Sequence, residues 1–338
     1  MTGLVIWAHS KCRSTFGLYR AIRDAAGVPV RIVSWAGVRA HRLAQGQCEQ
    51  DFADVDCPVI GEDWSAAERV LAETEGWLHL VAAYQVSPTF RRVALSAKRR
   101  GDPVGVISEA PWNACRGLGR LLWPTYVWTV LRRRVREVAS AADFLVNYSG
   151  DKCETALSLG WREEKIIPFG YFPAALVERG PGGDAHGRMR LLATATKSRK
   201  DRGEATIREA LRAFGNEVEL VLPDFVSTDE VVRLYGDCDV FIAAGRDEPW
   251  GIRVNDALNF GKPVLVSDGM GAEKIVRETG AGLVFRAGSA ADLSAKLREL
   301  TANYGRFAER ARAASAQIAP EAKARQLLAA IEGMVAKR

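Results

Sequence analysis

Two acids stand on either side of a glycine in the stretch Glu248-Pro-Trp-Gly-Ile-Arg-Val-Asn-Asp256. An apolar run of strand length, 239–244, comes directly before this stretch. A strand, a short polar turn and a glycine that opens a helix are where an α/β sheet presents backbone N–H groups to phosphate. The pattern therefore predicts that Glu248 lies in the turn and Asp256 in the first two turns of the helix, both facing one ligand. The alternative is a solvated turn acid and an ordinary helix acid.

A second candidate phosphate site is the basic turn 196–203, Thr-Lys-Ser-Arg-Lys-Asp-Arg-Gly. It lies between a predicted strand, 189–195, and a predicted helix, 204–214. Closely spaced cations beside a strand end repel one another unless an anion lies among them. The turn is therefore predicted to bind a phosphate group, with a solvated basic surface turn as the alternative.

The acid stretch and the residues after it resemble the signature of retaining glycosyltransferases of family four, which have the GT-B fold. The matching residues are Glu248, Pro249, Trp250, Gly251, Ala257, Gly261, Pro263 and Val264. Asp256 departs from the pattern, because the family has glutamate at that position. The later segment 265–276 resembles the family's Gly-Gly-x-x-Glu-Ile-Val loop at Gly271, Ile275 and Val276. In this segment Met270 replaces a glycine and Lys274 the glutamate.

This resemblance implies roles at the donor site. Glu248 is expected to contact the hydroxyls of the donor sugar, and Asp256 those of the ribose. Lys197 and Arg202 take the positions of the family's Arg and Lys, with the two charges exchanged, and are expected to neutralise the leaving diphosphate. The remaining donor-binding candidates are Gly251, Ile252, Arg253 and Gly271.

The resemblance also implies a chemistry. The family retains the anomeric configuration, with the leaving phosphate assisting the acceptor, so that no dedicated protein base is required. Two fixed cations reduce the need for a divalent metal. We therefore predict metal-independent transfer with no cofactor, the nucleotide-diphosphate sugar being the substrate.

Strands and helices alternate along the 338 residues, which predicts two doubly wound, Rossmann-like α/β domains. As in the GT-B fold, the two domains are expected to face each other across a cleft. The predicted boundaries are 1–178 for the first domain, 179–188 for a glycine-rich linker, 189–318 for the nucleotide-sugar domain, and 319–338 for a C-terminal helix that crosses back. Within the first domain we expect a third short strand around 55–60 and a helix capped by Asp63 or Ser65.

The chain's bulk features predict a cytoplasmic protein. Its start has no basic region and too short an apolar run for a signal peptide. No segment reaches the roughly 18 apolar residues of a membrane span. The six cysteines show no CxxC and no pairing rhythm, so reduced thiols are expected, with no metal site.

Positive charge is concentrated in one region. Residues 88–136 contain eleven Arg or Lys and two acids, a balance of +9 in a chain whose net charge is +6. The apolar segment 121–131 is flanked by arginines and contains aromatic residues that favour the headgroup level of a membrane. A core-facing helix with snorkelling arginines is the alternative. The candidates for contact with an anionic membrane surface are Arg120, Trp123, Trp128, Arg132, Arg133 and Arg134.

The acceptor is predicted from this charge balance. A basic, tryptophan-rich first domain suits a lipid-linked or saccharide acceptor at the inner membrane face, as in surface polysaccharide synthesis. The acceptor-side candidates are His9 and Arg13 after the first strand and Glu109 after the strand 104–108. For Glu109, a plain loop acid is the alternative.

Three other functions are weighed against the sequence as alternatives. A sugar-nucleotide epimerase would require more histidines and acids in the cleft than this sequence has. A pseudoenzyme or scaffold that binds a nucleotide sugar without turnover is compatible with the departures at Asp256 and Lys274. Nucleic-acid binding is not expected, because no recognised module with stacking aromatics is visible.

Overall fold

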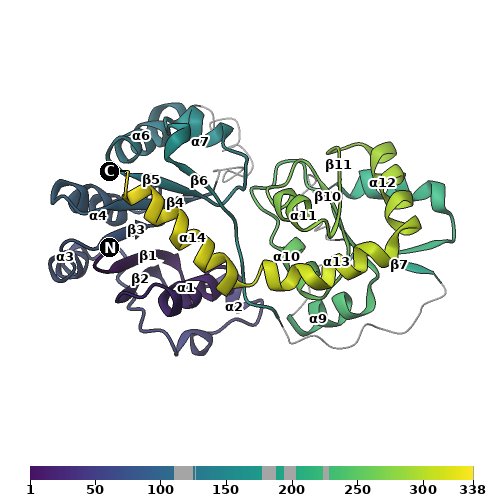
Figure 1. Ribbon diagram of the computed structural model, residues 1–338, viewed down its shortest axis with the longest axis horizontal. Helices are drawn as coiled ribbons and strands as arrows, with labels where there is room; N and C mark the ends of the chain where they lie inside the picture. Colours follow the sequence, from purple (N-terminus) through teal and green to yellow (C-terminus); the bar gives the residue numbers. More distant parts are fainter. Residues whose placement is uncertain (110–124, 126, 177–187, 194–202, 224–227, 338) are drawn as a thin grey trace. The chain divides into compact units, whose positions relative to one another are not determined.

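A computed structural model of the chain describes every residue except 110–124, 126, 177–187, 194–202, 224–227 and 338. The chain divides into two units. Unit 1 consists of Met1–Gly170 and Lys323–Arg338, and unit 2 of Tyr171–Ala322. Each unit has its own parallel β-sheet with surrounding helices (Figure 1). The predicted α/β fold with two Rossmann-like sheets is thereby confirmed. The predicted linker, 179–188, lies outside the described residues up to position 187.

The sheet of unit 1 has the order β2-β1-β3-β4-β5-β6, with all neighbours parallel. Its strands are β1 (Leu4–Ser10), β2 (Val30–Ala36), β3 (Leu78–Val81), β4 (Val104–Ser108), β5 (Phe144–Asn147) and β6 (Ile166–Pro168). Val5 and Trp7 of β1 pack into one hydrophobic core, whereas Leu4 and Ile6, equally buried, point to the opposite face. Because helices cover both faces, the strand is a continuous apolar run.

Helices connect these strands. They are α1 (Arg13–Ala25), α2 (Ala40–Leu43), α3 (Trp64–Glu73), α4 (Pro88–Arg99), α6 (Arg132–Ala141) and α7 (Glu154–Leu159), with short helices η1 (Glu49–Phe52), η2 (Val127–Leu131) and η3 (Glu163–Lys165). Asp63 caps α3 by accepting a hydrogen bond from the Ala66 amide at 3.1 Å, which decides between the two predicted caps. Ser87 caps α4 in the same way, with Pro88 at the first helical position.

The prediction of a strand around 55–60 is wrong. In the structure this segment forms a single bridge, between Ser34 and Val59. The Ser34 amide donates to the Pro58 carbonyl and the Ile60 amide to the Ser34 carbonyl. Pairing stops there because Pro58 has no N–H to donate and Gly61 has a positive φ of 56°, which turns the chain away.

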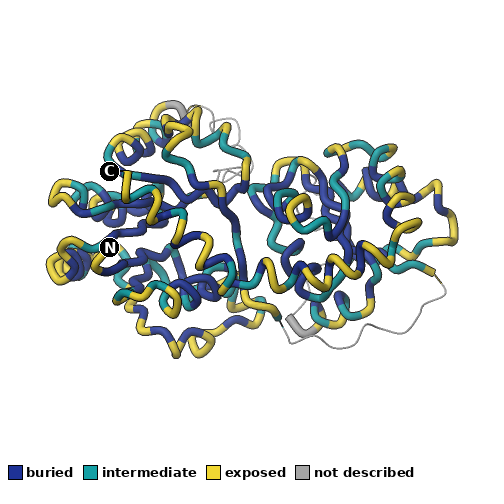
Figure 2. Tube along the Cα trace, viewed as in Figure 1, coloured by how far each residue is buried: buried dark blue, intermediate teal, exposed yellow. Residues whose placement is uncertain are grey.

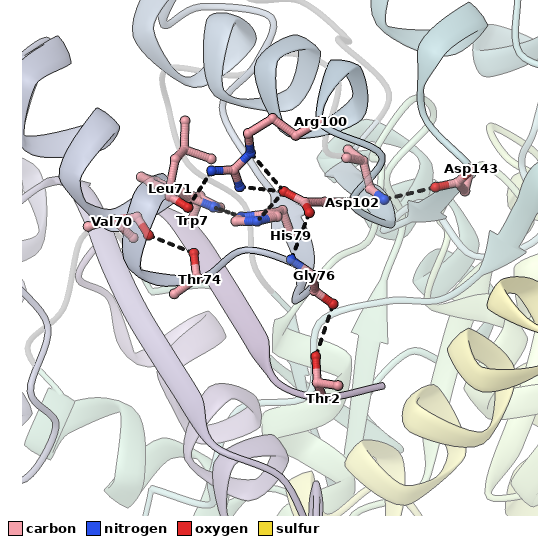
Figure 3. Close-up of polar contacts among 11 residues, drawn as sticks. Thr2, Trp7, Val70, Leu71, Thr74, Gly76, His79, Arg100, Asp102 and Asp143 are labelled. Atoms are coloured by element: carbon pink, nitrogen blue, oxygen red, sulfur yellow. Dashed lines mark hydrogen bonds and ion pairs between the residues drawn. The ribbon is translucent and has the colours of Figure 1, made fainter.

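A buried polar cluster lies at the amino edge of this sheet, where strands β3 and β4 begin (Figure 3). Asp102, 2% exposed, accepts hydrogen bonds from the Gly76 amide at 2.8 Å and from Arg100 Nε at 3.1 Å. His79 Nε2 is 3.5 Å from the Asp102 carboxylate, and the Trp7 indole donates to His79 Nδ1 at 3.2 Å. Burial lowers the pKa of His79 from 6.5 to about 4 although Asp102 opposes this, so the ring is neutral at pH 7.

The sheet of unit 2 has the order β11-β10-β9-β7-β8, again parallel throughout. Its strands are β7 (Met189–Ala193), β8 (Val218–Val221), β9 (Val240–Ala243), β10 (Val264–Ser267) and β11 (Gly282–Phe285). Its helices are α8 (Glu204–Leu211), α9 (Thr228–Asp237), α10 (Arg253–Asn259), α11 (Glu273–Thr279), α12 (Ala290–Ala302) and α13 (Tyr304–Gln317), with η5 (Arg212–Phe214) after α8. In Figure 2 the buried residues follow the strands of each sheet.

The last helix, α14 (Pro320–Val335), begins in unit 2, and its residues from Lys323 onward belong to unit 1. Its buried side chains include Ala324, Leu327 and Ile331. Their three- and four-residue spacing gives the helix one apolar face.

Candidate functional site

The loop between β9 and α10, which we call the Glu248 loop (residues 244–252), lies at the carboxyl edge of the unit 2 sheet. It is paired through its backbone with the loop after β10. The Glu248 amide donates to the Gly269 carbonyl at 3.1 Å, and the Gly271 amide donates to the Glu248 carbonyl at 3.2 Å. These bonds form a parallel bridge between Glu248 and Met270. The structure therefore brings the predicted donor-site residues Glu248 and Gly271 together, at the sheet edge where open α/β sheets bind ligands.

Gly251 is required where the Glu248 loop enters α10. Its φ is +98°, and a Cβ built there would lie 2.2 Å from Cε of Met270. A Cβ built at Gly245 would likewise lie 3.2 Å from Cγ and Sδ of Met270. The methionine that replaces a glycine of the resembled family thus fills the space under the loop, and both glycines leave room for it.

Asp256 is buried in the first turn of α10, 8% exposed. Its carboxylate is 3.5 Å from Nη1 of Arg253, so the two donor-site candidates on this helix form an ion pair. The Tyr235 hydroxyl donates to the Arg253 carbonyl at 3.0 Å. Burial, and then the negative charge of Asp256, raise the pKa of Tyr235 well above its ordinary value. Ile252 directly precedes the helix, as its N-cap residue.

Gly203, the last residue of the basic turn, lies at the same edge. Lys197 and Arg202 lie outside the described residues, and Gly203 is the first described residue after them. Gly203 has a φ of +76°, and a Cβ there would lie 2.3 Å from the carbonyl oxygen of Ala244, directly after β9. The chain that leaves the basic turn therefore passes against the start of the Glu248 loop. Lys274, at the position of the family's glutamate, pairs with Glu278 at 3.1 Å.

In unit 1, His9 forms a stack with Trp35 and Arg39 at the ends of β1 and β2. The His9 and Trp35 rings are 5.4 Å apart and 21° from parallel, and the Arg39 guanidinium lies 5.5 Å from the Trp35 ring. Arg39 Nη2 is 2.7 Å from His9 Nε2 and has only protons to offer, so this ring nitrogen accepts. Burial and the Arg39 charge lower the pKa of His9 to about 4. His9 is thus a neutral acceptor near pH 7.

Glu109 lies elsewhere along the same edge. It lines a recess at the ends of β3, β4 and β5, whose polar wall includes Gln85 and Ser108 and whose apolar wall includes Trp161. Gln85 Nε2 donates to Ser108 Oγ at 2.7 Å, which in turn donates to the Glu109 carbonyl at 2.9 Å. Because β3 separates β1 from β4, the structure does not gather the acceptor-side candidates. Glu109 stands apart from His9 and from Arg13, the first residue of α1.

The membrane-contact candidates are described only in part. Arg120 and Trp123 lie outside the described residues, as does the side chain of Trp128. Arg133 is exposed on α6, while Arg132 and Arg134 are half-buried. Within the described ranges, no helix has the length and apolarity to cross a membrane. The same part of the chain contains no group of three His, Cys, Asp or Glu side chains placed to hold a metal ion.

Residues 200–318, which include the Glu248 loop, α10 and the loop after β10 that contains Gly271, match the family of glycosyl transferases group 1. This segment of the chain is therefore a glycosyl transferases group 1 region. No curated protein matches the sequence of this chain.

Solved structures share the fold of this chain over nearly its whole length. Anabaena HepE, in complex with UDP and glucose, is similar with a TM-score of 0.65 and 13% identity over 100% of both chains. The lipopolysaccharide outer core galactosyltransferase WaaB has a TM-score of 0.67 and 10% identity over 98% of this chain and 99% of its own. A putative UDP-N-acetylglucosamine 2-epimerase from Listeria monocytogenes has a TM-score of 0.55 and 16% identity over 100% and 98%. The predicted GT-B fold is thereby confirmed. The likeness to glycosyl transferases group 1 rests on the match of residues 200–318.

Proposed function

We propose that this glycosyltransferase moves a sugar from a nucleoside-diphosphate sugar to a lipid-linked or saccharide acceptor, with retention of configuration, in surface glycan synthesis. The observation that carries the proposal is the backbone bridge between Glu248 and Met270. It joins the two loops that resemble the donor site of retaining family-four enzymes. The complexes of HepE with UDP and glucose are further support for a uridine nucleotide.

The roles of the unit 2 residues follow from charge and position. Glu248, half-buried at the sheet edge, accepts hydrogen bonds from hydroxyls of the donor sugar. Asp256 binds the ribose, with Arg253 balancing its charge. Lys197 and Arg202 neutralise the diphosphate as it leaves, which stabilises the charge that develops in the transition state.

The transfer step needs no protein base. The acceptor hydroxyl attacks the anomeric carbon on the face from which the diphosphate oxygen departs. A new C–O bond forms as the bond to the diphosphate breaks, and the hydroxyl proton passes to the leaving phosphate oxygen. In this proposal the positive charges of Lys197 and Arg202 take the place of a divalent metal.

We place the acceptor at an anionic membrane surface on the cytoplasmic side. Arg133 and Arg136 of α6 are exposed, and so is Arg99 near the end of α4, which packs on α6. Clustered basic side chains add roughly 1 kcal/mol each to binding at an anionic leaflet. These exposed arginines support the proposal that the protein binds peripherally to the inner face of the membrane.

A turnover assay tests the activity. Release of nucleoside diphosphate from UDP-glucose and other donors is measured with the wild type, with Glu248→Gln and with Asp247→Asn. Asp247, an exposed acid in the same loop, is the matched control. The proposal expects an α-linked product from an α-linked donor by NMR, and a rate lowered on the order of 100-fold in Glu248→Gln alone. Nucleotide binding without any turnover would contradict it and favour a scaffold.

Flotation with liposomes tests the membrane contact. Wild type is expected to float with vesicles that contain phosphatidylglycerol and not with neutral ones. The double variant Arg133→Glu/Arg136→Glu is expected to stay at the bottom of the gradient. Arg208→Glu/Arg277→Glu, which changes two exposed helix arginines of unit 2, is expected to float like the wild type. Equal flotation of both variants would contradict the assigned surface.

A further inference from the structure

We infer that Asn255 is a positioning residue, which holds the Glu248 loop to the first residues of unit 2. Its side chain is completely buried and forms two hydrogen bonds to different segments. Oδ1 accepts from the indole nitrogen of Trp250 at 2.8 Å, and Nδ2 donates to the carbonyl of Tyr171 at 2.9 Å. Tyr171 is the first residue of unit 2, so this one amide joins the loop to the place where the chain enters the unit.

Trp250 is the residue through which Asn255 acts. Its side chain is 2% exposed and meets the Phe172 ring edge-on, with centroids 5.5 Å apart. Its carbonyl accepts a hydrogen bond from the Ala272 amide at 2.9 Å. A ring held in this way cannot stack on a ligand. The aromatic residue of the motif therefore serves to fix the loop, whose ligand-facing group is Glu248 two residues earlier.

Only an amide satisfies both partners. Asn255 must accept one hydrogen bond and donate another, which asparagine does with its two distinct amide ends. Leucine has a similar volume but leaves the Trp250 N–H and the Tyr171 carbonyl without their bonds in a buried place, where unsatisfied polar groups are costly. Aspartate can accept from the indole but has no proton for the carbonyl. With either substitution, the loop loses its hydrogen-bonded connection to the Tyr171 carbonyl.

The inference rests on the proposed function, because its readout is the contribution of Glu248 to sugar binding. Affinities for UDP and UDP-glucose are measured by calorimetry with the wild type, Glu248→Gln, Asn255→Leu and the double variant. In the wild type, the sugar increases affinity through Glu248. A displacement of about 1 Å far from the chemistry can cost on the order of 100-fold, so Asn255→Leu is expected to lower transfer by 10- to 100-fold. Asn255→Leu is also expected to make the affinity for UDP-glucose equal to that for UDP. Adding Glu248→Gln to this variant is then expected to change the affinity for UDP-glucose very little.

The control is Asn259→Leu. Asn259 lies one turn further along α10, is also buried at 7% exposure, and pairs with Ser315 at 3.4 Å. Its substitution disturbs the same helix without touching the Trp250 contact, so the affinity gain from the sugar is expected to stay. If Asn255→Leu does not fold, Trp250→Phe provides the test, since it keeps a ring against Phe172 and removes only the indole donor.

The outcomes separate the two proposals. If Asn255→Leu or Trp250→Phe still binds UDP-glucose more tightly than UDP by the wild-type factor, and this difference depends on Glu248, the positioning role is overturned. The proposed function then stays intact. An equal loss in Asn259→Leu would show a general effect of disturbing α10 and would also overturn it. A wild type that binds neither UDP nor UDP-glucose would overturn the uridine donor site itself, before any variant is compared.

Discussion

Two buried aspartates each lie beside an arginine, one at the amino edge of its sheet and the other at the carboxyl edge. Asp102 is at the amino edge of the unit 1 sheet, where Arg100, His79 and the Gly76 amide surround its carboxylate (Figure 3). Asp256 follows the carboxyl edge of the unit 2 sheet, and Arg253 stands 3.5 Å away, beyond a normal hydrogen-bond length. The first acid is held by close, fixed donors of the protein. The second lies where ligands bind in open α/β sheets.

The comparison shows that an acid beside an arginine does not by itself indicate a binding site. What separates the two pairs is the end of the strand at which each lies. Asp102 directly precedes β4, whereas Asp256 comes after β9 and the Glu248 loop. We therefore expect loss of Asp102 to affect folding and loss of Asp256 to affect binding.

The largest effect is expected for Asp102→Asn. The substitution keeps the shape of the side chain but leaves Arg100 and His79 without their charged partner. Removal of one partner of a buried ion pair costs about 3–5 kcal/mol of unfolding free energy. Urea denaturation measures the loss, with Glu204→Gln, which breaks an exposed pair with Arg208, as a control expected to change stability by less than about 0.5 kcal/mol. A similar small change in Asp102→Asn would contradict the structural role.

Asp256→Asn should give the converse result. A hydrogen bond from a hydroxyl to a charged carboxylate contributes about 1.5–3 kcal/mol, so nucleotide affinity is expected to fall about tenfold or more. The cost to stability is expected to be smaller than that of Asp102→Asn. Calorimetric titration with UDP and urea denaturation of the same variant measure both quantities. Unchanged affinity with a large stability loss would place Asp256 with Asp102 as a structural acid.

A smaller effect is expected at Gly251. Alanine there must adopt a φ near +98° and meets Cε of Met270. A positive φ in a non-glycine residue costs about 1–3 kcal/mol. Thermal unfolding of Gly251→Ala and of Gly251→Ala/Met270→Ala separates the two causes, since the second variant removes the contact and keeps the strained φ. Full recovery of stability in the double variant would mean that φ is not the limiting factor.

A pH dependence of stability is expected from the two neutral histidines. The pKa values of His79 and His9 are about 4 in the folded state and 6.5 ordinarily, so the unfolded chain binds more protons between these values. Stability is therefore highest above pH 6.5 and falls as the pH is lowered toward 4. Urea midpoints from pH 4 to 7.5 are expected to show this slope, with a shallower slope in His79→Gln. An unchanged slope in that variant would contradict the neutral, buried ring.

The sequence was sufficient to predict the sheets and the main loops of the site. Continuous apolar runs such as 4–8 and glycines such as Gly251 are local features, and these determine strands and turns. The segment 55–60 resembles a strand in its apolar residues, although the structure has only a bridge at Val59. The roles of Trp250 and Asn255 could not be read from the sequence, because their partners Tyr171 and Phe172 lie about 80 residues earlier in the chain.

The central claim is that the Glu248 loop is part of a nucleotide-sugar site. The most direct test is a thermal-shift panel of UDP, GDP, ADP and their sugars with the wild type, Glu248→Ala and Asp247→Ala. A ligand that binds the native state raises its stability, by about 2.7 kcal/mol at 100 times its Kd. We predict that one nucleotide raises the Tm of all three proteins, and that its sugar raises it further only where Glu248 is present. No shift with any nucleotide in the wild type would contradict the account.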